Sequence, residues 1–159
     1  MWVHDMKPIA FQCDRVIPLS ADRICSEIAD TSRWSEFGGY GVLPGIENAE
    51  YELRTQAMVG SRIRVRNTDG SGHVEEICAW IPGKEVAMKL HEFTPPLSRL
   101  ATHFIEEWTF RPENGATHVT RRFELYPKRP ATRPLVWLIS LLFRRAIARH
   151  LEAMGAMAG

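Results

Sequence analysis

The stretch Arg133-Pro-Leu-Val-Trp-Leu-Ile-Ser-Leu-Leu-Phe-Arg-Arg-Ala-Ile-Ala-Arg-His-Leu-Glu-Ala-Met154 predicts one long amphipathic helix. Its apolar residues recur every three or four positions and form a stripe, while most of its charged residues gather on the opposite side. The stripe consists of Val136, Ile139, Phe143, Ile147, Leu151 and Met154. A helix of this kind buries its stripe against a partner, and the rest of the chain has to supply that partner.

The partner that the sequence offers is a β-sheet. A first strand is expected at Ile9–Ile17, followed by two short helices, at Ala21–Ala29 and at Ser32–Phe37. About six further strands follow up to Tyr126, because apolar and polar residues alternate there between glycine-containing turns. The sequence therefore predicts an α+β fold, with a curved antiparallel six- to seven-stranded sheet around the long C-terminal helix.

Size and composition narrow the class of protein. The 159 residues fit a single domain, 1–159, with flexible tails at 1–8 and 155–159. The net charge of +1 gives no overall field that would attract nucleic acid. The chain shows no signal-peptide pattern and no membrane-spanning apolar run, and its three cysteines form no CxxC pair. We therefore expect a cytoplasmic protein with free thiols.

Three groups of residues resemble the START-like (SRPBCC) helix-grip superfamily, and within it the bacterial polyketide cyclase/dehydrase and lipid-transport group. They are Asp30-Thr-Ser-Arg-Trp34, Ala79-Trp-Ile-Pro-Gly-Lys84, and the pair Glu107-Trp-Thr-Phe-Arg-Pro112 and Gly115-Ala-Thr-His-Val-Thr120. The resemblance runs from about Ile9 to Met154. It implies a helix-grip fold with an internal cavity, on which binding proteins, lipid carriers and cyclising enzymes are all built. No catalytic residue carries over by motif.

Strand alternation and the helical stripe together predict which side chains face the inside. The expected ligand-binding residues are Tyr51, Ile63, Val65, Met88, Leu90, Phe104, Trp108, Val119, Phe123, Ile139, Phe143 and Ile147. Such a set would hold an apolar or aromatic molecule through buried area. A filled core, in which the same side chains touch one another, is the alternative.

Two charged residues share the inward positions of their strands, and both are candidate catalytic residues. Glu106 lies between Phe104 and Trp108, and Arg121 lies between Val119 and Phe123. Because an isolated buried charge is costly, we expect the two to pair across neighbouring strands. The pair could anchor a ligand or supply an acid and a base for enolisation, and the alternatives are a structural ion pair or a bulge that turns one residue outward.

Other motifs favour structural roles. The histidines show no HxH or HExxH spacing, so neither a metal nor another cofactor is predicted, and His150 is expected at the edge of the helical stripe. The glycine-rich segment Gly38–Gly45 lacks the lysine of a phosphate loop and is interpreted as a flexible cavity lid. Alternation places Arg62, Arg64 and Arg66 on the outer sheet face, where glutamates can pair with them, which argues against nucleic acid binding.

The start of the final helix is more apolar than one buried face requires. Trp137, Leu138 and Leu141 lie away from the main stripe, and arginines flank them. These residues could contact an anionic membrane surface, form a homodimer, or pack beneath the proline-rich segment Pro127–Pro134.

These observations favour the binding or transport of a small hydrophobic ligand, such as a lipid, a polyketide or an aromatic metabolite. The alternatives are a cyclase or dehydratase that uses Glu106 and Arg121, and a module that docks on a membrane or protein partner through its final helix.

Overall fold

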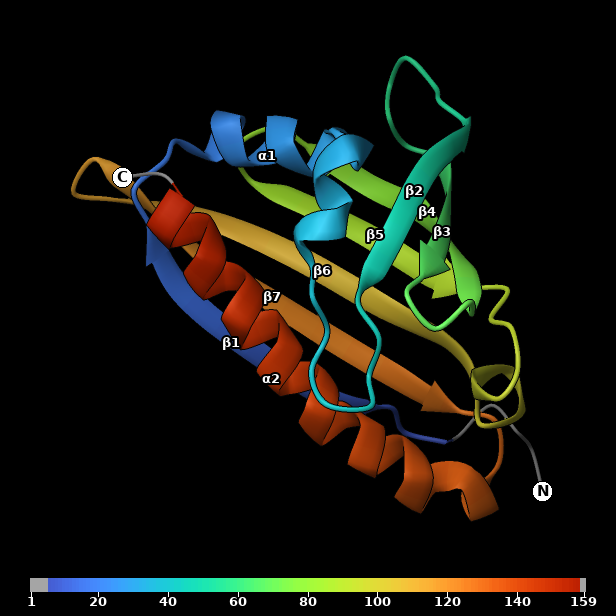
Figure 1. Cartoon of the computed structure of the whole chain (residues 1–159). Coiled ribbons are helices and arrows are strands. Elements are labelled where there is room, and N and C mark those ends of the chain that lie inside the picture. The colour runs from blue at the N-terminus through green and yellow to red at the C-terminus, as the bar shows by residue number, and fades with distance from the viewer. Residues whose placement is uncertain (1–5, 158–159) are drawn as a thin grey trace.

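The protein is described here from a computed structural model, which covers residues 6–157. Parts of both predicted tails, residues 1–5 and 158–159, lie outside the described residues. The strands are β1 (Ile9–Ile17), β2 (Ile46–Leu53), β3 (Arg62–Asn67), β4 (Gly72–Ile81), β5 (Glu85–His91), β6 (Ala101–Glu113) and β7 (Ala116–Pro127). The helices are α1 (Ala21–Ala29), α2 (Arg133–Met157) and the 3₁₀ turns η2 (Thr31–Glu36), η3 (Leu97–Arg99) and η4 (Pro130–Thr132) (Figure 1).

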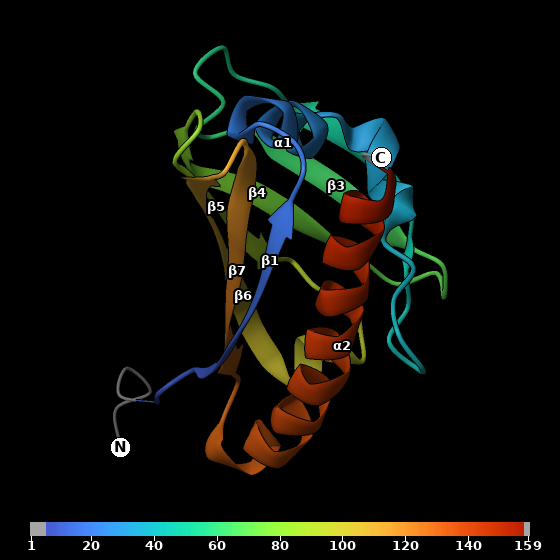
Figure 2. The same ribbon diagram turned by 90° about the vertical axis from the view of Figure 1, so that its left-hand side faces the viewer.

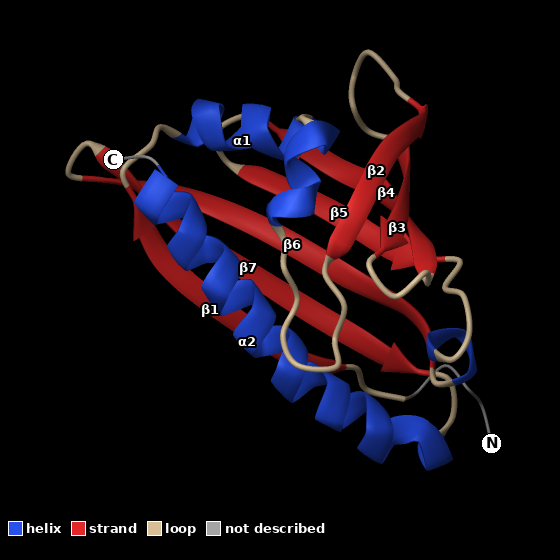
Figure 3. Cartoon of the chain, in the orientation of Figure 1, coloured by secondary structure: helices blue, strands red, loops and turns tan. Residues whose placement is uncertain are grey.

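The strands of the described residues form one antiparallel sheet in the order β1-β7-β6-β5-β4-β3-β2. The first strand, β1, therefore pairs with the last strand, β7. Strands β2 to β7 form a meander, in which each strand pairs with the next one in the chain. The predicted α+β helix-grip class is confirmed, and the sheet has seven strands (Figure 3).

Local sequence signals explain where the two short helices begin. Ser20 caps α1, since its hydroxyl oxygen accepts a hydrogen bond from the backbone N–H of Arg23 at 3.2 Å. Asp30 caps η2 in the same way by accepting from the backbone N–H of Ser32 at 3.1 Å. The second short helix is therefore a 3₁₀ helix that begins one residue earlier than the sequence indicates.

The long helix lies on one face of the sheet, toward one edge. α2 packs against β1 and β7, and α1 and η2 lie over the other end of the same face (Figures 1 and 2). The helix ends at Met157, three residues beyond the predicted end, so residues 155–157 are helix and not tail. Because α2 packs against β1 and β7, it does not cover the inner face of β4, β5 and β6, and other segments lie over that part of the sheet.

The aromatic core beneath α2 fixes the helix against the sheet. The centre of the Phe143 ring lies 4.6 Å from the ring centre of Phe123 on β7 and 5.6 Å from the ring centre of Phe11 on β1. The rings of Phe11 and Phe123 are themselves stacked at 5.2 Å, and Phe123 is fully buried. At this edge the side chains fill the space between helix and sheet.

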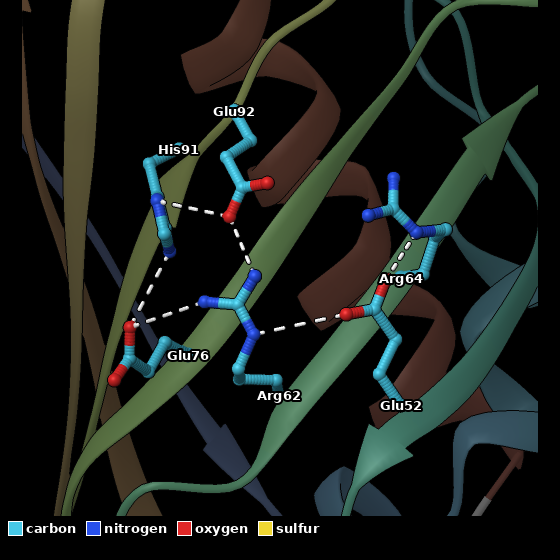
Figure 4. A network of polar contacts seen from close by, with 6 residues as sticks. All are labelled: Glu52, Arg62, Arg64, Glu76, His91 and Glu92. Atoms are coloured by element: carbon cyan, nitrogen blue, oxygen red, sulfur yellow. Dashed lines mark hydrogen bonds and ion pairs between the residues drawn. The ribbon is translucent and has the colours of Figure 1, made fainter.

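The opposite face of the sheet carries the arginine row of β3, and glutamates of neighbouring strands neutralise it. Arg62 lies within 4 Å of the carboxylates of Glu52, Glu76 and Glu92, and Arg64 pairs with Glu52 (Figure 4). α2 lies behind the strands in this view, so the network is on the far side of the sheet from the helix. The arrangement is that of a solvated outer face, as the sequence indicates.

Candidate functional site

A cavity of about 390 Å³ lies between the inner face of the sheet and the helices. Strands β4 to β7 supply its floor, and α2, η2 and the loops before β2 and after β5 supply its walls. Most of the lining side chains are aliphatic or aromatic. The cavity occupies the part of the sheet that α2 does not reach.

Seven of the twelve residues expected to bind a ligand line this cavity. They are Met88, Leu90, Phe104, Trp108, Ile139, Phe143 and Ile147. The other five are Tyr51, Ile63, Val65, Val119 and Phe123, which do not line it.

The five residues outside the cavity lie where the space is already filled. Ile63, Val65, Val119 and Phe123 are almost completely buried in the packed core. Tyr51 is half-buried, and its hydroxyl donates a hydrogen bond to the carbonyl oxygen of Ala29 at 2.7 Å, which ties β2 to the end of α1. Strand alternation correctly indicates an inward side chain, but it does not separate cavity from core.

Some lining residues come from segments that strand alternation does not address. Trp34 and Phe37 lie in or just after η2, and Phe93 and Leu97 lie between β5 and β6. The Trp34 indole N–H donates a hydrogen bond to the carbonyl oxygen of Ile28 at 2.9 Å. The motif Asp30-Thr-Ser-Arg-Trp34 therefore positions an aromatic side chain in the wall of the cavity. The apolar character of these four residues was the only signal for them in the sequence.

The glycine-rich segment Gly38–Gly45 lies over the cavity, as expected for a lid. Val42, Leu43 and Pro44 line the cavity. The backbones of Tyr40 and Leu43 exchange two hydrogen bonds of 3.0 Å, so the segment is a closed turn. Gly39 has a φ of 73°, and a Cβ atom there would meet the carbonyl oxygen of Leu43 at 2.3 Å. Only glycine fits this turn.

Glu106 and Arg121 meet in the floor of the cavity and are both buried. The Arg121 Nη2 donates to both carboxylate oxygens of Glu106, at 3.0 and 3.2 Å. The indole N–H of Trp108 donates to the same carboxylate at 2.5 Å. The sheet register explains this meeting, because Arg121 lies directly opposite Trp108 on β6, two residues from Glu106.

The Arg121 guanidinium is also held from two other sides, although its buried Nε has no hydrogen-bond partner among the described residues. It lies over the Trp108 ring, with its Cζ 4.0 Å from the ring centre. Its Nη1 donates to the Nδ1 of His150 on α2 at 3.0 Å. Arg121 therefore connects β6, β7 and α2. The helical periodicity of the sequence placed His150 only at the edge of the apolar stripe and did not indicate this contact.

Burial sets the protonation of these groups. It raises the pKa of Glu106, and the neighbouring Glu75 carboxylate raises it further, against the lowering effect of the Arg121 cation. Burial, reinforced by the Arg121 cation, lowers the pKa of His150 to about 3. His150 is therefore a neutral imidazole throughout the physiological range.

A second polar pair, His73 and Glu75 on β4, also lines the cavity. The His73 Nε2 lies 2.9 Å from a carboxylate oxygen of Glu75, which is itself buried. Within residues 6–157, no three His, Cys, Asp or Glu side chains gather in a way that would hold a metal ion. No helix among these residues is long and apolar enough to cross a bilayer.

This chain is similar to known proteins in its three-dimensional structure. No protein-family model and no curated protein matches the sequence. A START superfamily protein from Mycobacterium smegmatis matches with a TM-score of 0.69 and 15% identity, over 94% of this chain and 99% of that one. The major latex-like protein 151 from Panax ginseng matches with a TM-score of 0.62 and 16% identity, over 94% and 99%.

The di-domain ARO/CYC StfQ from the steffimycin biosynthetic pathway matches with a TM-score of 0.70 and 15% identity. The match spans 96% of this chain and 51% of StfQ, so this chain is similar to about half of that protein. Identities this low show the fold alone. The chain has the START-like helix-grip fold, as its sequence motifs imply.

Proposed function

We propose that this protein binds or carries a small hydrophobic molecule in the cavity that α2, η2 and the inner face of the sheet enclose. The observation that carries the proposal is the cavity itself, about 390 Å³ with a largely apolar lining, where a filled core was the alternative. Proteins of the START-like fold bind small hydrophobic ligands, and this chain shares their fold. Its polar floor groups, Glu106 and Arg121, bind each other and leave the apolar walls to supply affinity.

The size of the cavity sets the affinity to be expected. A ligand of the size of naphthalene that loses about 250 Å² of apolar surface gains roughly 6 kcal/mol, from which the cost of association is subtracted. Because roughly 6 kcal/mol alone would correspond to a dissociation constant of about 40 µM, the measured dissociation constants should lie above that value.

The proposal is tested by filling the cavity. The double variant Leu90→Trp/Ile139→Trp places two indole rings in the cavity, because both residues line it. Native mass spectrometry and displacement of a fluorescent lipid should detect binding of apolar molecules to the wild type and at least a tenfold weaker binding to the variant. Leu53→Trp is the matched control, since Leu53 is exposed on β2. Equal binding by all three proteins would show that the cavity is not the binding site.

A cyclase or dehydratase activity is the competing function. The buried, cavity-lining Glu106 with its raised pKa favours it. Against it, both carboxylate oxygens of Glu106 already accept hydrogen bonds from Arg121, and one also accepts from Trp108. The variant Glu106→Gln distinguishes the two functions, because an acid–base role predicts loss of turnover with ligand binding retained.

The exposed side of α2 supports a second proposal, that this helix rests on an anionic membrane surface. Leu135, Trp137, Leu138 and Leu141 are all 44–52% exposed, so the proline-rich segment before the helix does not cover them. Six basic residues flank them in the sequence, namely Lys128, Arg129, Arg133, Arg144, Arg145 and Arg149, and no acidic residue lies between Glu124 and Glu152. Among the described residues none of these six basic side chains forms a salt bridge, in contrast to the arginines of β3.

Vesicles of phosphatidylcholine with and without phosphatidylserine test the membrane proposal. Binding should require the anionic lipid, weaken as salt is added, and fall at least about fivefold in Trp137→Ala. Ile81→Ala is the matched control, because Ile81 is similarly exposed at the end of β4. Sedimentation that instead reports a dimer of the wild type and a monomer of Trp137→Ala would assign this surface to a second copy of the chain.

A further inference from the structure

The hydrogen bond between Arg121 and His150 fixes where the imidazole proton resides. The guanidinium of arginine carries only donors, so the Nδ1 of His150, 3.0 Å from Arg121 Nη1, has to be the acceptor. A neutral imidazole that accepts at Nδ1 carries its hydrogen on Nε2. The tautomer of His150 is therefore determined by its neighbour on β7.

The second nitrogen of this ring has no hydrogen-bond partner within the described part of the chain. Among residues 6–157, the only hydrogen bond of the His150 side chain is the one with Arg121. The ring lines the cavity next to Phe37, whose ring centre is 5.8 Å away. The Nε2–H is therefore a donor in an apolar wall, and such donors are satisfied by a ligand or by water.

The charges around the cavity argue against an anionic ligand. Each arginine in the lining is already paired, Arg121 with Glu106 and Arg33 with Glu27 and Glu36. Glu75 adds another carboxylate to the lining. A ligand carboxylate or phosphate would find no free cation there and would meet carboxylates.

We propose that His150 is a ligand-binding residue whose Nε2–H donates a hydrogen bond to an uncharged oxygen acceptor on an otherwise apolar ligand. Ketones, esters and ethers have such an oxygen. Arg121 acts as a positioning residue, since it holds the ring and its tautomer. The inference rests on the proposed binding function and narrows the class of ligand.

Three naphthalene probes of similar shape test the proposal. They are 2-acetylnaphthalene, which has a ketone oxygen, 2-isopropenylnaphthalene, which replaces that oxygen by a methylene group, and the anion 2-naphthoate. Calorimetric titration of the wild type should show the ketone binding about 5- to 10-fold more tightly than the hydrocarbon, which is the usual effect of one buried neutral hydrogen bond. The carboxylate should bind more weakly than either.

Two variants of His150 show whether this residue makes the difference. His150→Phe keeps an aromatic ring beside Phe37 and removes the donor. The ratio of the hydrocarbon and ketone dissociation constants should then fall to about 1. His150→Gln places an amide N–H₂ at a similar reach and should restore part of the preference. Circular dichroism of each variant checks that the fold is kept.

Infrared spectroscopy of the bound ketone gives a second readout that a merely structural role would not change. The carbonyl stretch should move to lower frequency in the wild type and return to its value in apolar solvent in His150→Phe. Equal affinity for ketone and hydrocarbon in the wild type, or a ketone preference that survives His150→Phe, would overturn the assignment and leave the proposed cavity function standing. Failure of all three probes to bind would overturn both.

Discussion

Arg121 is the side chain on which the polar floor of the cavity depends. It pairs with Glu106, covers the Trp108 ring and donates to His150, so three elements meet at one guanidinium. Removal of one partner from a buried ion pair leaves the other charge without compensation. Burial of either charge alone is therefore expected to destabilise the folded protein much more than burial of the pair.

Arg121→Met is expected to lower the free energy of unfolding by about 3–5 kcal/mol, because Glu106 then remains buried without its cation. The double variant Glu106→Leu/Arg121→Met should recover most of that loss, since no charge remains in the floor. Chemical denaturation followed by circular dichroism measures both. A single variant that loses less than about 1 kcal/mol would mean that water reaches Glu106.

His150 gives the protein a predictable response to acid. Its pKa is about 3 in the folded chain, against about 6.5 for an unfolded histidine. Between about pH 6.5 and pH 3 the histidine is protonated in the unfolded chain but neutral in the folded chain. The contribution of His150 to the free energy of unfolding is therefore complete above about pH 6.5 and is lost as the pH falls toward 3.

Between about pH 7 and pH 4.5 the wild type should therefore lose roughly 2 to 3 kcal/mol more stability than His150→Gln, whose side chain does not titrate. Denaturant titrations at several pH values measure the difference, and the carboxylates common to both proteins cancel in it. Parallel pH profiles would show that His150 is protonated in the folded state.

The lid between η2 and β2 is the element whose geometry depends most on single glycines. Gly39 has the left-handed φ of 73° and lies against the backbone of Leu43, whereas a Cβ atom added at Gly38 would meet no other atom within 4 Å. The neighbouring residues therefore provide a test and its own control.

Gly39→Ala should distort the lid, cost about 1–3 kcal/mol of stability and weaken ligand binding several-fold, because Val42, Leu43 and Pro44 line the cavity. Gly38→Ala should leave both within error of the wild type. Thermal denaturation and titration with 2-acetylnaphthalene compare the two. Similar behaviour of the two variants would separate the lid from ligand binding.

At the scale of the elements, the sequence predicted more of the fold than of the site. Strict alternation in β7 from Thr117 to Leu125 matches alternating burial in the structure. The burial of Glu106 and Arg121 also followed from alternation. Periodicity reports which way a side chain points, and the sheet register then brings the two charges together.

What the sequence could not predict depends on the placement of whole elements. Val119 and Phe123 point inward like Trp108, yet they lie in filled core because α2 packs on β1 and β7. Trp34, Phe37 and Phe93 line the cavity from segments without regular periodicity. The tautomer of His150 could not be predicted either, because it depends on a hydrogen bond with Arg121, which is 29 positions away in the chain.

For the whole molecule, the proposed function depends on a ligand that enters the cavity between the helices and the sheet. Met88 on β5 and Met154 on α2 line the cavity from two sides, while Met58 lies against the core between β2 and β3 and does not line it. The methyl groups of these three methionines therefore report separately on the cavity and on the rest of the core.

Titration of ¹³C-methyl-methionine protein with 2-acetylnaphthalene, followed by NMR, tests the proposed binding site most directly. Ring-current shifts should appear at the Met88 and Met154 methyl groups, saturate together, and be absent at Met58, with Met88→Leu and Met154→Leu to assign the signals. Saturable binding that leaves Met88 and Met154 unshifted, or no binding at all, would contradict the claim that the cavity is the binding site.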